Sequence, residues 1–138
     1  MSLFNIFDIA GSGMSAQSIR LNVTASNISN AESVASEPGA AYKARNPVFA
    51  AIYQDAFQPS KDSVGVKTLG IVESQAEHPK RYEPGNPLAD EEGYIYLSNV
   101  NAMEEMTNMM SATRSYQNNI EMLNTSKDLL LQTLRLGE

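Results

Sequence analysis

The prolines of this 138-residue chain are confined to its middle. All six fall between Pro38 and Pro87, so the first 37 residues and the last 51 contain none. Because a proline in a helix interior costs about 3 kcal/mol, this placement favours helices at both ends with strands and turns between them. The pattern predicts an α+β fold in three parts: a helical segment over 1–37, a Pro/Gly-rich middle over 38–100 and a helix over 101–138.

The C-terminal segment has the stronger helical pattern. Apolar residues recur at steps of three and four for about four heptads, and only Thr113 and Lys127 are polar entries in this seam. Asn101 precedes the run and can cap its first turn. A helix of roughly 35 residues is long for a chain of this size, which indicates a partner helix. The seam residues that we assign to assembly are Met106, Met109, Tyr116, Ile120, Leu123, Leu130 and Leu134.

The N-terminal segment offers that partner helix, although its seam is weaker. Gln17 and Thr24 lie in the seam, and Gly11 and Gly13 are expected to form a flexible break. The outer faces are rich in Ser and Asn and nearly uncharged, which favours packing against other helices over exposure to solvent. We expect the two helices to pair as a coiled-coil-like inner layer. The residues assigned to assembly in this segment are Phe7, Met14, Leu21, Asn27, Ile28 and Asn30.

The middle segment reads as short strands joined by turns. Alternating residues over 64–72 and the run Tyr94–Leu97 predict strands, and the Pro-Gly and Asn-Pro steps over 82–90 predict a loop.

Composition excludes several classes of protein. The chain has no Cys and one His, which rules out disulfides and thiolate metal clusters, and its net charge of −6 disfavours nucleic-acid binding. The first basic residue is Arg20, so a cleaved secretory signal is not expected. No stretch approaches the roughly 20 apolar residues that cross a bilayer.

Gly11–Ala16 (GSGMSA) matches the G-x-G-x-x-A form of a dinucleotide-binding fingerprint, with Asn5–Ala10 as a candidate strand before it. The acid required about 20 residues on would be Glu32, but Glu32 does not follow a strand. We therefore favour an interfacial helix over a nucleotide site.

Other polar residues also have ordinary interpretations. His78 is read as a solvated turn histidine, because only carboxylates lie near it as potential co-ligands of a metal. Adjacent Glu104 and Glu105 point about 100° apart on a helix and suit its first turn. Residues 90–92 lack the alternating acids of a calcium loop. We predict no catalytic, cofactor-binding or metal-binding residue.

Three stretches of the chain resemble, in order, signatures of the bacterial flagellar rod, hook and hook-associated proteins. Residues 12–32 resemble the N-terminal signature, a small-residue helix that passes through Arg-Leu and ends in Asn-Ile/Leu-x-Asn-Ala; Ser29 stands where the family often has Ala. Residues 82–94, followed by Asn99-Val-Asn101, and residues 106–120 are typical of rod members. The opening over 3–10 and the short middle are most similar to proximal-rod members.

The resemblance implies a structural subunit of the flagellar basal-body rod, and hence a role in motility without enzymatic activity, cofactor or metal. It implies export through the flagellar type III apparatus without a cleaved signal, and assembly in the periplasm. The terminal helices would form the inner layer of a hollow helical tube that transmits torque. Implied partners are other copies, other rod proteins, the rod-to-membrane-ring adaptor and the export apparatus. The alternative that we keep is a soluble coiled-coil adaptor or chaperone.

Overall fold

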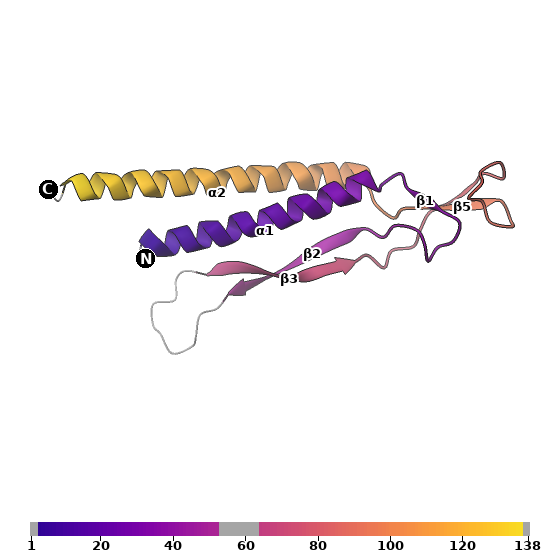
Figure 1. Ribbon diagram of the computed structural model, residues 1–138, viewed down its shortest axis with the longest axis horizontal. Helices are drawn as coiled ribbons and strands as arrows, with labels where there is room; N and C mark the ends of the chain where they lie inside the picture. Colours follow the sequence, from indigo (N-terminus) through magenta and orange to yellow (C-terminus); the bar gives the residue numbers. More distant parts are fainter. Residues whose placement is uncertain (1–2, 53–63, 137–138) are drawn as a thin grey trace.

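The structure is a computed structural model that describes residues 3–52 and 64–136. Two long antiparallel helices run along it, α1 over Leu3–Ser29 and α2 over Ala102–Leu136. Figure 1 shows α1 lying between α2 and a two-stranded ribbon, with a small sheet at the far end of the molecule. Two helices with two small antiparallel sheets confirm the predicted α+β class.

The strands form two separate antiparallel sheets. The two-stranded ribbon pairs β2 with β3. Arg45 lies opposite Glu73 at one end of this pairing, and the register shifts between Val48 and Phe49. In the small sheet, β5 lies between β1 and β4. The strands are β1 (Val34–Ala35), β2 (Arg45–Ile52), β3 (Gly65–Glu73), β4 (Lys80–Tyr82) and β5 (Tyr94–Leu97).

The predicted elements are present with shifted ends. The strand at Tyr94–Leu97 is confirmed, and the one predicted over 64–72 runs over Gly65–Glu73. Asn101 caps α2, because its side-chain oxygen accepts hydrogen bonds from the backbone N–H groups of Met103 and Glu104, at 3.2 and 3.4 Å. Helix α1 ends at Ser29, so the rest of the segment predicted as helical over 1–37 contains a turn and strand β1.

The flexible break expected at Gly11 and Gly13 is wrong, because α1 is continuous through both glycines. A Cβ at Gly13 would lie 2.9 Å from the side-chain nitrogen of Asn119, so this glycine permits close approach of α2. The neighbouring Ser12 hydroxyl accepts a hydrogen bond from the N–H of Val66 at 3.1 Å and donates to the carbonyl of Ile9 at 2.8 Å. One turn of α1 therefore contacts both the helix and the ribbon.

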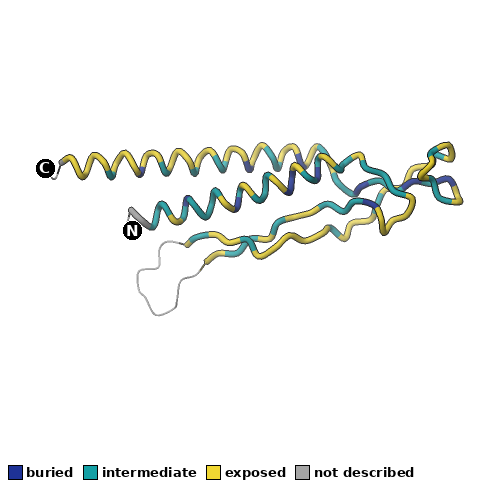
Figure 2. The backbone as a smooth tube through the Cα atoms, viewed as in Figure 1, coloured by how far each residue is buried: buried dark blue, intermediate teal, exposed yellow. Residues whose placement is uncertain are grey.

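The internal core is small. Figure 2 shows that much of α2 is exposed, above all towards its C-terminal end. Among the described residues, Ile95 is the only large apolar side chain that is fully buried, and four of the six buried apolar residues are alanines. The buried apolar residues are Ala10, Ala16, Val23, Ala41, Ile95 and Ala112.

Candidate assembly surface

The face of α2 towards its partner helix alternates small or polar residues with large ones. Its least exposed positions recur at steps of four and three, the spacing of a helix that packs along one face. Alternate positions of this inner face are small or polar, and the positions between them are large. The inner-face residues are Glu105, Met109, Ala112, Tyr116, Asn119, Leu123, Ser126 and Leu130.

This face corrects half of the predicted seam. Met109, Tyr116, Leu123 and Leu130 are half-buried on it, but the other predicted positions are displaced by one residue. The prediction placed large apolar residues against α1, whereas the close approach at Gly13 leaves room only for smaller groups there. The three exposed seam residues among those assigned to assembly are Met106, Ile120 and Leu134.

Large apolar side chains instead cover the outward faces of α2, and we call this set the outer apolar surface. Met103 is 74% exposed, Met110 64% and Leu134 62%. Figure 1 shows that α2 also extends past the N-terminal end of α1. Several large apolar side chains left exposed along one helix mark it as a candidate interaction surface. The outer apolar surface consists of Met103, Met106, Met110, Ile120, Met122, Leu129, Leu131 and Leu134.

The α1 residues assigned to assembly do not lie on an exposed surface of this kind. The apolar ones are half-buried, and Asn30 donates a side-chain hydrogen bond to the carbonyl of Ser26 at 2.8 Å. Asn27 is 0% exposed and belongs to the interior. Their role in assembly stays a prediction. The half-buried apolar residues are Phe7, Met14, Leu21 and Ile28.

Asn27 joins three segments of the chain through hydrogen bonds. Its side-chain nitrogen donates to the carbonyl of Arg45 at 2.8 Å and to a carboxylate oxygen of Glu105 at 3.1 Å. Its side-chain oxygen accepts from the N–H of Arg45 at 2.9 Å and from the hydroxyl of Tyr42 at 3.0 Å. These four bonds fix the end of α1 against the start of β2 and the first turns of α2. We call this cluster the Asn27 junction.

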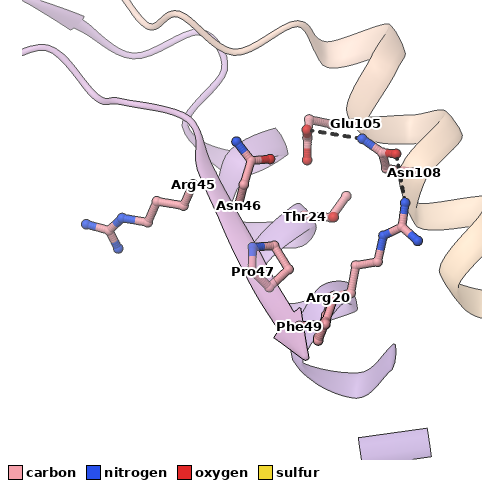
Figure 3. Close-up of a pocket in the computed structure, with 8 residues that line it drawn as sticks. All are labelled: Arg20, Thr24, Arg45, Asn46, Pro47, Phe49, Glu105 and Asn108. Atoms are coloured by element: carbon pink, nitrogen blue, oxygen red, sulfur yellow. Dashed lines mark hydrogen bonds between the residues drawn. The ribbon is translucent and has the colours of Figure 1, made fainter. Parts of the chain in front are cut away.

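A groove of about 300 Å³ opens beside the junction, where α1, β2 and α2 meet. Figure 3 shows the amide of Asn108 between the guanidinium of Arg20, on α1, and the carboxylate of Glu105, on α2. Its oxygen accepts from Arg20 at 3.1 Å, and its nitrogen donates to Glu105 at 3.4 Å. The lining residues are Arg20, Thr24, Arg45, Asn46, Pro47, Phe49, Glu105 and Asn108.

The predicted loop over 82–90 closes the β4–β5 hairpin. Asp90 organises its turn, since one carboxylate oxygen accepts from the N–H groups of Glu92 and Tyr94, at 3.0 and 2.8 Å. Gly93 has a φ of +83°, and a Cβ there would lie 2.9 Å from the ring of Tyr82. Burial first, and then Asp90, raise the pKa of the Tyr96 hydroxyl above its usual value, so it remains a donor to Asp90. Asp90 therefore serves the geometry of this turn.

The chemical alternatives find no support in the geometry. His78 is half-buried, with Nδ1 3.0 Å from the carbonyl of Leu97, which corrects the expectation of a solvated histidine. Within residues 3–52 and 64–136, no three acidic or histidine side chains gather as metal ligands. Asn5–Ala10 is helical, so the glycines after it do not follow the strand that a dinucleotide fingerprint needs. Neither α1 nor α2 has a run long and apolar enough to cross a membrane.

Sequence reasoning missed most of the groove and the junction. Glu105 was read as a favourable charge in the first turn of α2, where it does lie, but its burial at 8% exposure was not predicted. Arg20, Tyr42 and Arg45 were not assigned to any site. The available signal was Thr24, which together with Gln17 is a polar entry in the apolar seam of the N-terminal helix, because buried polar groups are usually hydrogen-bonded.

Comparison with known proteins agrees with this architecture. The family model for the flagella basal body rod protein matches residues 7–34, and the model for the flagellar basal body rod FlgEFG protein C-terminal region matches residues 91–136. The chain is 54% identical over 138 residues to the flagellar basal-body rod protein FlgC of Salmonella typhimurium and 52% identical to that of Escherichia coli, covering all of each chain. The FlgC protein of Buchnera aphidicola is 44% identical over 140 residues, again across both full lengths. The chain therefore belongs to the family of flagellar basal-body rod proteins, which are structural components and not enzymes.

Proposed function

We propose that the chain is a subunit of the proximal flagellar rod that is exported through the flagellar type III apparatus and assembled in the periplasm. In this role, α1 and α2 form the inner layer of a hollow helical tube that transmits torque. Its partners are other copies, neighbouring rod proteins and the rod-to-membrane-ring adaptor. The family relationship supports the rod assignment, and the shape of the helix pair supports the mode of assembly.

The observation that carries the mode of assembly is the outer apolar surface. Eight large apolar side chains of α2 are 38% to 74% exposed, while the face towards α1 alternates small or polar residues with half-buried large ones. Burying a Leu, Ile or Met contributes about 1.5–3 kcal/mol, so covering even half of this surface would strongly favour association. A helical tube can do so, because each subunit meets its neighbours through different faces.

Methionine suits such a surface. Met103, Met106, Met110 and Met122 are unbranched and adapt their conformation to non-identical neighbours. A subunit that contacts both its own kind and other rod proteins needs that tolerance.

Two measurements test the proposal. A tagged chain, expressed in Salmonella typhimurium lacking its own FlgC, should restore swimming and co-purify with basal bodies. The same chain with Met110→Asp should be exported but absent from basal bodies, whereas Asn118→Asp, which adds the same charge at an exposed polar position of α2, should incorporate normally. Wild-type chain that is exported yet never found in basal bodies would refute the rod assignment.

A further inference from the structure

We propose that the groove beside Arg20 binds a side-chain carboxylate of a second copy of this chain. The inference rests on the proposed rod function and adds a specific polar contact to the apolar one. Four observations support it. Among the described residues, most N–H donors of Arg20 are not used, and the hydroxyl of Thr24 makes no hydrogen bond. The hydrogen bonds of Glu105 keep its carboxylate away from the guanidinium, and α2 presents exposed acids.

Arg20 is the only basic residue in α1, and its guanidinium reaches into the groove (Figure 3). It is half-buried and donates to the neutral amide of Asn108, and no carboxylate in the described parts of the chain lies within 4.0 Å of it. A guanidinium carries five N–H groups in a planar fork that matches a carboxylate with two parallel hydrogen bonds. Most of these donors are therefore available to a ligand.

Thr24 adds a second group to the site. It is 3% exposed, lines the groove, and has no side-chain hydrogen bond to any other described residue. Figure 3 places its hydroxyl between Arg20 and the strand residues Asn46 and Pro47. Because this hydroxyl lines the groove and makes no hydrogen bond there to a described residue, it can donate one to a carboxylate oxygen held by Arg20.

Glu105 is the acid that a bound carboxylate would have to avoid. Its two oxygens accept hydrogen bonds from the amides of Asn27 and Asn108, and Asn108 separates it from the guanidinium. Arg45 also lines the groove, but its side chain extends away from it in Figure 3, and its ion-pair partner is Glu73, 3.6 Å away. The ligand position is therefore on the Arg20 and Thr24 side, where Pro47 and Phe49 provide an apolar wall.

The occupant follows from charge complementarity within the chain. Glu121 and Asp128 are exposed on α2, seven residues and hence two turns apart, and neither forms an ion pair among the described residues. Met122 and Leu129 of the outer apolar surface follow them directly in sequence. A neighbouring α2 laid against this groove would thus deliver a carboxylate to Arg20 while burying apolar side chains.

The test compares incorporation of variants into basal bodies at equal export. Arg20→Glu should lower incorporation about tenfold or more, because removing one partner of a buried interfacial ion pair weakens association at least that much. Arg20→Lys should retain most of it. Lys67→Glu, an equal charge change at an exposed lysine of β3 outside the groove and away from α2, should incorporate like wild type.

Charge reversal identifies the occupant. Combining Arg20→Glu with Glu121→Arg or with Asp128→Arg in the same chain should restore incorporation for one of the two pairs, since every copy then presents the reversed partner. Restoration also shows that Arg20→Glu folds. Normal incorporation of Arg20→Glu, or a loss that neither reversal restores, would overturn the inference while wild-type incorporation leaves the rod assignment intact. Failure of wild-type chain to incorporate would instead refute the rod assignment.

Discussion

Replacing Asn27 with Ala tests whether the Asn27 junction holds the helices and the ribbon together. The side chain is fully buried and makes four hydrogen bonds, to both backbone groups of Arg45, to Tyr42 and to Glu105. Alanine removes all four bonds and leaves both backbone groups of Arg45 without these partners, whereas Tyr42 and Glu105 keep their hydrogen bonds to Ser26 and Asn108. The interior offers little compensation, because Ile95 is the only large apolar side chain fully buried in the described residues.

The expected loss can be worked out from these contacts. A net contribution of about 1 kcal/mol per hydrogen bond gives about 4 kcal/mol for the four bonds. Alanine is a better helix former than asparagine and returns roughly 0.5 kcal/mol. The free energy of unfolding should therefore fall by about 3.5 kcal/mol, which is a large fraction of the 5–15 kcal/mol typical of a domain.

Urea unfolding followed by far-ultraviolet circular dichroism measures this change. With a slope of about 1.5 kcal/mol/M, the midpoint should fall by about 2 M. Asn22→Ala is the matched control, since Asn22 is exposed on the same helix and should gain a few tenths of a kcal/mol from helix propensity alone. Equal midpoints for the two variants would show that the junction does not stabilise the fold.

Three further substitutions have defined outcomes. Gly93→Ala should destabilise the chain by about 1–3 kcal/mol in the same urea assay, because φ at this position is +83° and the new Cβ meets the ring of Tyr82; an unchanged midpoint would contradict the turn geometry. Gly13→Leu should lower stability by about 1–3 kcal/mol, because the larger side chain forces α1 and α2 apart. Adding Asn119→Ala should recover part of that loss; a double variant as unstable as Gly13→Leu alone would show that the clash is not with Asn119. Leu123→Asp should reduce stability in solution because Leu123 is half-buried on the inner face of α2. Leu134→Asp should change the free energy of unfolding by less than about 0.5 kcal/mol but block rod incorporation; the opposite pair of results would show that the two faces are exchanged.

Local signals in the sequence predict much of the fold. The absence of proline, the Asn101 cap and the heptad spacing locate α2 to within two residues of its ends, and the run Tyr94–Leu97 is strand β5. Each of these features depends on residues close together in the chain. The positions of Met109 and Leu123 are also placed correctly, because the predicted seam and the observed inner face of α2 share every seventh residue from 109.

The remaining half of the seam depends on information outside the helix itself. The pattern of large apolar residues predicts which residues leave water, but not whether they do so within one chain or between chains. Here Gly13 permits a close approach of α1 to α2. Small residues such as Ala112 and Ser126 therefore lie on the inner face of α2, and Met106 and Leu134 point outward. An apolar seam was correctly recognised, but half of its positions are displaced by one residue from those that face α1.

The polar sites could not be predicted for a related reason. The partners of Asn27 lie 15, 18 and 78 residues away in sequence, so no local pattern brings them together. Strand β2 pairs with β3 at a similar distance, and its alternation is weakened by the register shift at Val48. Such contacts follow from the tertiary arrangement alone.

The most direct test of the account is the accessibility of the outer apolar surface before and after assembly. Because the chain contains no Cys, Met110→Cys introduces a single thiol at a position that is 64% exposed. Maleimide labelling should be rapid in the free subunit, strongly reduced in intact basal bodies from motile cells, and restored when the same basal bodies are dissociated in denaturant. Equal labelling in intact and dissociated basal bodies would contradict the claim that neighbouring subunits cover this surface.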